Sequence, residues 1–326
     1  MIVLATGASG FLGRAVAAEL VARGHEVRTL QRRPSGVVGA TDMLGSITDP
    51  DTVARALECV EGVVHLAAKV SLAGDPREFR AVNIDATARL LEAARTAGVG
   101  HVVHVSSPSV AHAGAALAGS GADPASPERA HGEYARTKAE AELRALAADS
   151  AAMSVTAIRP HLVWGPGDTQ LVERILERAR RGRLPLLGGG TALIDSTYID
   201  NAASGIVAAL GRPDATRGRA FVLTNGEPRP VGDLLAGICL AGGVRPPRWS
   251  IPAALGRGAG SLIERVWAIR PGHDEPPMTR FLAEQLSTAH WFDQRDTRRA
   301  LDWAPTVSID EGLRRLAAHY GGHTGG

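Results

Sequence analysis

A chain of 326 residues, 44 % of them hydrophobic, is long enough for one large domain or for a large and a small one. Its formal net charge of +2 creates no strong field, so a nucleic-acid partner is not expected. Cys59 and Cys239 form neither a metal-ligand spacing nor a disulfide framework. No apolar run approaches the roughly 18 residues that span a bilayer, and the chain shows no secretory pattern. We therefore expect a cytoplasmic protein without a metal site or a transmembrane segment.

The first half of the chain alternates short apolar runs with helical stretches. Helices are expected at residues 11–23, 80–97 and 132–148, and strands at residues 2–5, 26–30, 63–66, 101–105 and 155–158. This alternation predicts an α/β fold with a Rossmann-type, doubly wound parallel sheet. Such sheets bind ligands outside the carboxyl ends of their strands.

The pattern loosens after residue 159, where Pro160 and the glycine-rich stretches 165–167 and 188–190 interrupt it. We expect residues 1–159 to form a dinucleotide-binding domain. Residues 160–326 are expected to form a smaller, less regular and mainly substrate-binding portion, interleaved with the first.

A glycine-rich turn follows the first predicted strand, in the stretch Thr6-Gly7-Ala8-Ser9-Gly10-Phe11-Leu12-Gly13. One glycine makes the tight turn, one lets the backbone approach a phosphate, and one lets helix and strand pack closely. The helix that begins here favours negative charge at its amino terminus. The turn therefore predicts a dinucleotide site at Gly7, Ser9, Gly10, Phe11, Leu12 and Gly13; the alternative is a structural turn in a fold with another ligand.

The end of the second predicted strand bears on the choice of cofactor. NAD sites usually carry an acidic residue there, which bonds the ribose 2′-hydroxyl. This chain has Gln31 at that position, followed by Arg32 and Arg33, so no carboxylate is expected to repel a 2′-phosphate. The segment favours NADP(H) over NAD(H), unless both arginines are merely solvated surface charges.

Tyr134 and Lys138 lie one helical turn apart on one face of a predicted helix. A nearby ammonium stabilises a phenolate, so Lys138 is expected to lower the pKa of Tyr134. Tyr134 then exchanges a proton with a carbonyl oxygen while hydride moves to or from carbon. Ser107, at a predicted strand end, is the candidate that orients the carbonyl. The histidines, among them His65 and His104, are interpreted as packing residues.

These features together resemble the extended short-chain dehydrogenase/reductase superfamily. Residues 6–13 look like its glycine turn, and Ser107, Tyr134 and Lys138 match its catalytic residues. The resemblance implies that Tyr134 and Lys138 also contact the cofactor. It extends the predicted cofactor contacts to Ser46, Ile47, Leu66, Ala67, Ala68, Asn83 and Pro160. Ser46 departs from the family pattern, which often has Asp near the adenine.

Within that superfamily the chain resembles the 3β-hydroxysteroid dehydrogenase branch, and in particular its 2-alkyl-3-oxoalkanoate reductases. Residues 106–110, 159–168, 194–201 and 278–286 carry this likeness. The resemblance implies NADPH-dependent reduction of a bulky, apolar 2-alkyl-3-oxo acid to the 3-hydroxy acid. It also implies a homodimer that pairs through the helices near residues 80–97 and 132–148.

Several other functions remain open at this point. The enzyme alternatives are a steroid dehydrogenase, a polyketide-type ketoreductase and a nucleotide-sugar epimerase; arginines at 178, 180, 181 and 183 could meet a diphosphate in the last of these. A non-catalytic dinucleotide sensor is the alternative from a different class. The segment 251–269 carries apolar residues broken by charges. It either caps an apolar substrate, touches a membrane surface as a peripheral contact, or packs on the core as an ordinary amphipathic helix.

Overall fold

The computed structural model describes residues 1–71, 74–112, 114, 116–269 and 280–321. Within these residues a seven-stranded sheet forms the centre of the molecule, and each of its hydrogen-bonded pairs is parallel. Its strand order is β12 (Ala220–Leu223), β7 (Ser154–Pro160), β5 (His101–Val105), β4 (Gly62–His65), β1 (Ile2–Thr6), β2 (Glu26–Gln31) and β3 (Ala40–Leu44). The expected Rossmann-type α/β fold is confirmed.

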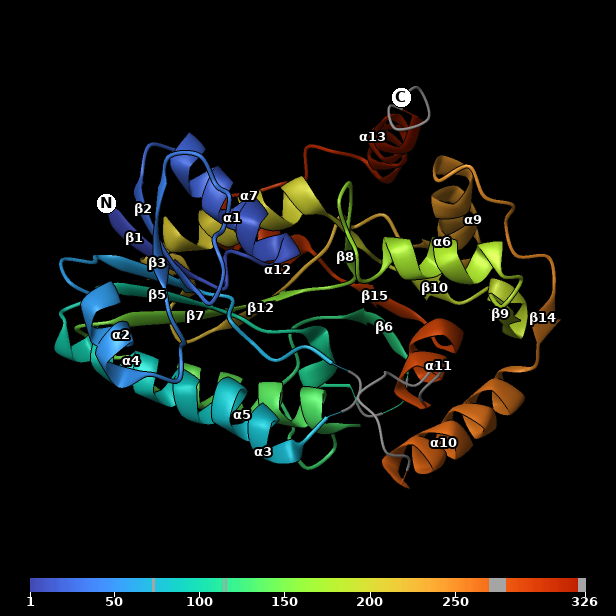
Figure 1. The fold of residues 1–326 in the computed structure, drawn as a ribbon, viewed down its shortest axis with the longest axis horizontal. Coiled ribbons are helices and arrows are strands. Elements are labelled where there is room, and N and C mark those ends of the chain that lie inside the picture. The colour runs from blue at the N-terminus through green and yellow to red at the C-terminus, as the bar shows by residue number, and fades with distance from the viewer. Residues whose placement is uncertain (72–73, 113, 115, 270–279, 322–326) are drawn as a thin grey trace.

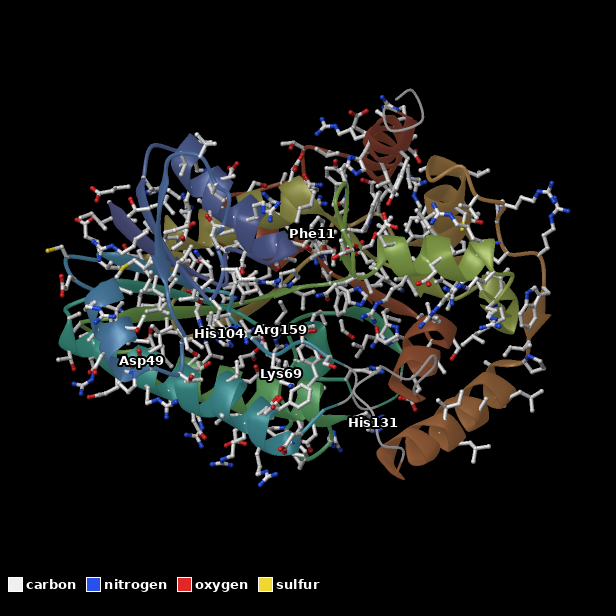
Figure 2. The ribbon with its side chains drawn as sticks, in the orientation of Figure 1. Phe11, Asp49, Lys69, His104, His131 and Arg159 are labelled. Carbon is white, nitrogen blue, oxygen red and sulfur yellow. The ribbon has the colours of Figure 1, made fainter. Side chains whose placement is uncertain are left out.

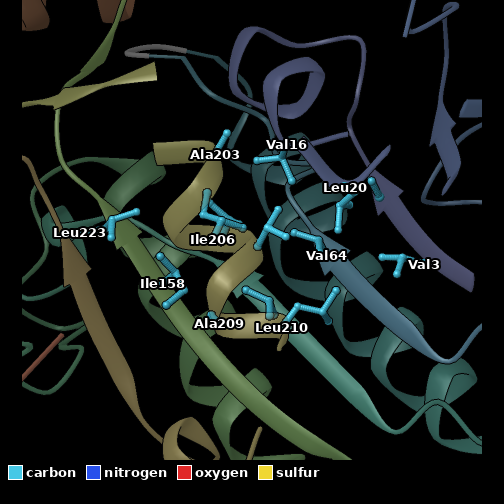
Figure 3. Close-up of a cluster of buried hydrophobic side chains, with 14 of the residues drawn as sticks. Val3, Val16, Leu20, Val64, Ile158, Ala203, Ile206, Ala209, Leu210 and Leu223 are labelled. Atoms are coloured by element: carbon cyan, nitrogen blue, oxygen red, sulfur yellow. The ribbon is translucent and has the colours of Figure 1, made fainter. Parts of the chain in front are cut away.

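Helices cover both faces of this sheet (Figure 1). Side chains alternate along β1, so that Val3 and Ala5 point to one face and Leu4 points to the other. The first face packs on α1 (Phe11–Ala22), α7 (Ile199–Leu210) and α12 (Arg295–Leu301), as Figure 3 shows for α1 and α7. The second face packs on α2 (Pro50–Ala56), α4 (Ala86–Thr96) and α5 (Glu133–Ala147). Burial on two faces explains why these strands read as continuous apolar runs.

The sheet recruits elements from both halves of the sequence. Strand β12 pairs with β7 at the edge, and α7 packs on the first face, although both come after residue 160. The smaller C-terminal portion therefore shares its core with the sheet. Neither β12 nor β3 was predicted, because each is short and β3 carries the polar stretch Thr41-Asp42.

One predicted helix differs from expectation. The stretch 80–97 is not one α-helix: α3 (Pro76–Phe79) leads into a π-helix at Arg80–Asp85, and α4 follows. Asn83 lies buried in the π-turn and bonds to two neighbouring segments, which compensates for the less favourable backbone geometry. The helix predicted at 132–148 is confirmed as α5.

The C-terminal portion carries further small sheets and a second core. A four-stranded sheet has the order β13 (Arg229–Pro230), β10 (Leu193–Ile194), β15 (His290–Phe292) and β6 (Leu117–Ser120) within the described residues. Two-stranded pairs join β8 (Val163–Trp164) to β11 (Thr197–Tyr198), and β9 (Leu186–Leu187) to β14 (Ser250–Ile251). The remaining helices are α6 (Val172–Arg180), α8 (Pro213–Thr216), α9 (Val231–Ala241), α10 (Ala253–Ile269), α11 (Arg280–Ser287) and α13 (Ile309–Gly321), with short 3-10 turns at Pro108–Val110 and Gly188–Gly190.

Around Trp164 and Tyr198, helices α6, α9 and α13 form the second core. No helix in the described parts of the chain is long and apolar enough to cross a membrane. Residues 278 and 279 of the stretch 278–286 lie outside the described residues.

Candidate active site

The glycine turn after β1 is closed by its own backbone. Gly7 has a φ of +76°, which favours glycine, and the amide of Gly10 donates to the Gly7 carbonyl at 3.0 Å. A Cβ added to Gly13 would lie 2.2 Å from that carbonyl oxygen, so only glycine fits there. A Cβ at Gly7 would lie 2.9 Å from the Cα of Ala67. The turn is therefore packed against the loop that follows β4.

A single hydroxyl joins these two loops. The Thr6 hydroxyl accepts hydrogen bonds from the amides of Leu66 at 3.2 Å and Ala67 at 3.1 Å. It also lies 2.8 Å from Nδ1 of His65, whose Nε2 lies 2.9 Å from the Thr87 hydroxyl. Burial, together with the charge of Lys138, lowers the pKa of His65 to about 3. His65 is thus a neutral linker that fixes the loop 66–68, in line with the packing role expected for it.

The residues present fit a dinucleotide pyrophosphate. Gly10 is the N-cap of α1, and the first turn of this described helix carries no acidic residue. Its free amides, which begin at Phe11, form a ready site for an anion. Phe11 marks this point in Figure 2, near the middle of the molecule. Ser9, Leu66 and Ala68 lie in the same two loops, and Leu12 lies in the first turn of α1.

A carboxylate that the sequence did not predict, that of Asp42 on β3, lies beside the end of β2. The Asp42 carboxylate on β3 accepts from the Gln31 amide at 3.0 Å, the Thr29 hydroxyl at 2.6 Å and the Ser35 amide at 2.9 Å. Burial alone raises the pKa of Asp42, but hydrogen bonds from Ser35 and Thr29 outweigh it and keep this pKa below its usual value. The expectation that no carboxylate lies here is therefore wrong. Arg32 and Arg33 follow and are exposed.

Ser46 and Ile47 follow β3 at the same edge of the sheet. The Ser46 hydroxyl lies 2.7 Å from the Thr48 hydroxyl and accepts from the Thr48 amide at 3.2 Å. Ile47 is buried in the core beneath α2. The Gly45 amide donates to the Gln31 carbonyl at 3.0 Å, which holds this loop beside the end of β2.

The Ser/Tyr/Lys residues gather where β5 ends. Ser107 caps the 3-10 turn after β5, and its hydroxyl accepts from the Ser109 hydroxyl at 3.0 Å. The Tyr134 phenol is hydrogen-bonded to Ser107. Lys138, on the same face of α5, is buried, and its Nζ donates to the Val105 carbonyl at 2.6 Å. One edge of the sheet therefore presents a hydroxyl, a phenol and an ammonium together.

The electrostatics differ from expectation at the phenol. Burial raises the pKa of Tyr134, and only the bond from Ser107 opposes it. The prediction that Lys138 lowers this pKa is wrong for this structure, because the ammonium is bonded to the backbone of β5. Burial also lowers the pKa of Lys138 to about 8, against the opposing charge of Glu142. The phenol thus keeps its proton at neutral pH, as a proton donor must.

Asn83 joins the loop after β4 to helix α5. Its Oδ1 accepts from the Lys69 amide at 2.7 Å, and its Nδ2 donates to the Lys69 carbonyl at 3.2 Å and the Thr137 hydroxyl at 3.0 Å. Thr137 lies directly before Lys138. With its amide fully engaged, Asn83 holds the loop after β4 against α5.

A buried ion pair holds the same helix from the other side. Glu142 lies one turn beyond Lys138 and accepts from the Arg159 guanidinium at 2.9 and 2.5 Å. A third bond runs from Arg159 to the Asp123 carbonyl at 2.7 Å. Both side chains are buried, with 2 % and 1 % exposure. Arg159 precedes Pro160 at the end of β7, and Figure 2 labels it near His104. Sequence reasoning missed Glu142, although its spacing from Lys138 is that of a helix neighbour.

Similarity to known proteins identifies the family of this chain. The model of the NAD dependent epimerase/dehydratase family matches residues 3–224. The chain belongs to this family, the extended short-chain dehydrogenase/reductases. Like its relatives, it is an NAD(P)-dependent oxidoreductase.

Two relatives and one solved structure illustrate the range of the family. The chain is 42 % identical to a 2-alkyl-3-oxoalkanoate reductase of Stenotrophomonas maltophilia, over 98 % of this chain and 99 % of that protein. It is 31 % identical to a 3 beta-hydroxysteroid dehydrogenase/Delta 5-->4-isomerase of Mycobacterium tuberculosis, over 98 % and 90 %. Its fold is similar to MoeE5 in complex with UDP-glucose and NAD, with a TM-score of 0.76, 25 % identity and 99 % of both chains covered.

The glycine turn gives a direct test of the cofactor site. We expect Gly13→Ala to force its methyl group against the Gly7 carbonyl, destabilise the fold by about 1–3 kcal/mol and weaken binding of both NADPH and NADH. Thermal melting and a fluorescence titration measure the two effects. Gly121→Ala is the matched control, because no atom lies within 4 Å of a Cβ there. Equal cofactor affinity in the Gly13 and Gly121 variants would contradict this role.

The buried pair gives a second test. Glu142→Gln leaves the Arg159 charge buried without a counter-charge, so we expect a loss of about 3 kcal/mol in the free energy of unfolding. Removing the carboxylate also lowers the pKa of Lys138 further, so the alkaline limb of the pH–rate profile moves to lower pH. Glu140→Gln, on the same helix and paired with Arg144 at 2.8 Å nearer the surface, is expected to change little. Similar pH profiles for the two variants would argue against an electrostatic link to Lys138.

Proposed function

We propose that this enzyme is an NADPH-dependent ketoreductase that reduces a bulky, apolar 3-oxo substrate, a 2-alkyl-3-oxoalkanoate, to the 3-hydroxy product. The observation that carries the proposal is the Tyr134 phenol, partly buried, protonated and bonded to Ser107, one helical turn from Lys138. The relative at 42 % identity, named as a 2-alkyl-3-oxoalkanoate reductase, supports this choice of substrate class.

In the proposed step, the bound nicotinamide supplies a hydride to C3 of the substrate. Ser107 and Tyr134 hydrogen-bond the C3 carbonyl oxygen and orient it toward the phenolic proton. Tyr134 transfers that proton as the C–O double bond becomes a single bond, so that ketone, hydride and proton give the alcohol. The phenolate that remains is then reprotonated by solvent. Lys138, one helical turn away, would hydrogen-bond the ribose of the bound nicotinamide.

The cofactor would be held by the two loops that Thr6 joins, with the pyrophosphate on the amino terminus of α1. We place the 2′-phosphate beside Arg32 and Arg33. Three neutral donors hold the Asp42 carboxylate in place and keep it charged, and the two arginine cations would outweigh its single charge. Gln31, Ser46 and Ile47 line the same edge and would lie along the adenosine half.

We also propose that the enzyme is a homodimer and that it works in the cytoplasm. Residues 160–326 would supply most of the substrate-binding surface. Two copies would pair through α4 and α5, where Leu143 is an exposed apolar residue of α5. Free Cys59 and Cys239 fit a reducing compartment such as the cytoplasm.

The function is tested by NADPH oxidation at 340 nm with a synthetic long-chain 2-alkyl-3-oxoalkanoate. We expect turnover by the native enzyme and a loss of about 10²–10⁴-fold in kcat for Tyr134→Phe, which removes only the transferable proton. Tyr198→Phe is the matched control, since this phenol lies in the C-terminal core. NADPH binding should survive both changes.

Other outcomes point to other functions. Turnover of a steroid or a polyketide ketone instead would keep the mechanism and change the substrate class. Oxidised cofactor retained through purification, with activity on a UDP-sugar, would favour an epimerase. NADPH binding without turnover of any of these substrates would point to a dinucleotide sensor.

Cofactor choice is tested at the two arginines. We expect Arg32→Ser/Arg33→Ser to raise KM for NADPH at least tenfold, because two cations near the 2′-phosphate are lost, while KM for NADH changes little. Arg28→Ser, on β2 and bonded to backbone carbonyls at the other end of the strand, is the control. An equal effect on both cofactors, or better turnover with NADH in the native enzyme, would overturn the NADP(H) assignment.

A further inference from the structure

An ordinary amphipathic helix packs its large apolar residues against the protein. Several described residues of α10 show the opposite arrangement. Its inward face is made by Gly256 and Gly260, which are buried, and a Cβ at Gly256 would lie 2.9 Å from the Leu187 side chain. Its outward face carries Leu255 and Leu262, which are 64 % and 63 % exposed. The two leucines lie two turns apart, on one side of the helix. At these described positions of α10, Gly256 and Gly260 thus face the protein, and Leu255 and Leu262 face outward.

Other exposed apolar residues lie near this helix in the chain. Trp249, just before β14, is 48 % exposed, and Leu240, at the end of α9, is 66 % exposed. In Figure 1, α10 lies at the outer edge of the molecule, away from the seven-stranded sheet and from α4. Strand β14 leads directly into α10, so Trp249 lies beside the start of this helix, whereas α9, which carries Leu240, lies apart from it (Figure 1). Exposed large apolar residues that gather in one region indicate an interaction surface.

The charged residues in this part of the sequence are all positive. From Leu234 to Ile263 the sequence contains no Asp, Glu or Lys, but it contains Arg245, Arg248 and Arg257. Arg245 and Arg248 are exposed on the connection between α9 and β14, directly before Trp249. A positive rim around exposed leucines and a tryptophan matches the interface of an anionic lipid bilayer, where arginines meet headgroups and tryptophan lies at headgroup depth.

We propose that Trp249, Leu255 and Leu262, with Arg245 and Arg248, form a surface that docks on an anionic membrane. A second copy fits less well, because a two-fold contact through this face would bring the arginines of both copies together. Docking does not depend on the reductase activity. One consequence rests on the proposed function: docking would then hold the enzyme at the lipid bilayer, into which a substrate with long alkyl chains partitions.

The test is co-sedimentation of the full chain with vesicles of phosphatidylglycerol and, separately, of phosphatidylcholine. We expect binding to phosphatidylglycerol that weakens with salt. Leu255→Ser/Leu262→Ser should weaken it at least tenfold, since each leucine loses much of its burial in lipid. Arg245→Ser/Arg248→Ser should weaken it several-fold on phosphatidylglycerol alone. Val38→Ser, at a residue 92 % exposed in the loop after β2, is the matched control and should bind as the native chain does.

Two controls keep the outcomes distinct. Circular dichroism and thermal melting establish that each variant is folded, and sedimentation velocity reports the oligomeric state. The proposal is overturned by absence of binding to phosphatidylglycerol vesicles, or by binding that the leucine changes leave intact. It is also overturned if Leu255→Ser/Leu262→Ser dissociates an oligomer without altering vesicle binding, since the face then joins copies of the chain.

Discussion

The ion pair between Arg159 and Glu142 fixes the helix that carries Tyr134 and Lys138. It is buried at the end of β7, and the bond from Arg159 to the Asp123 carbonyl brings the loop before α5 into the same contact. Two buried charges are expensive to desolvate and are tolerated only with near-complete hydrogen bonding, which this geometry provides. The pair therefore sets where α5 lies along the sheet. Because Lys138 is one turn away, the Glu142 carboxylate of this pair also opposes the fall in the pKa of Lys138 that burial causes.

The remaining constraints are polar bonds between loops at one edge of the sheet. Thr6 joins the loops after β1 and β4, and Asn83 joins the loop after β4 to α5. Lys138 joins α5 to the end of β5. In the proposed reaction, the Thr6 bonds join the two loops that hold the cofactor, and the Asn83 bonds join one of these loops to the helix that handles the proton. The Lys138 bond then anchors that helix to the sheet. The site is thus positioned by side chains that do not themselves react, and a small shift in any one loop would reach the others.

The parts of this site that depend on unusual residues were predictable. Gly7 and Gly13 are required by a positive φ and by a close backbone approach, so their spacing alone indicates the turn. Tyr134 and Lys138 were predictable because helical spacing places them on one face. Asp42 was not, because it lies on a short, polar strand whose pairing with β2 depends on the whole sheet. The π-helix around Asn83 has no sequence pattern that distinguishes it from α-helix.

Helix α10 shows a different limit. Leucines and glycines at helical spacing predict an amphipathic helix, but they do not say which side faces the protein. Here Gly256 meets Leu187 and leaves no room for a larger inward side chain, so the leucines turn outward. Orientation of this kind follows from tertiary packing, which sequence periodicity does not contain.

The central claim is that this site moves a hydride from NADPH to C3 of a 3-oxo substrate. It is tested most directly with NADPH that carries deuterium at both C4 positions of the nicotinamide, followed by mass spectrometry of the product. The account predicts a 3-hydroxy product that is heavier by one deuterium, located on C3. A product without deuterium, or with deuterium at another carbon, would contradict it.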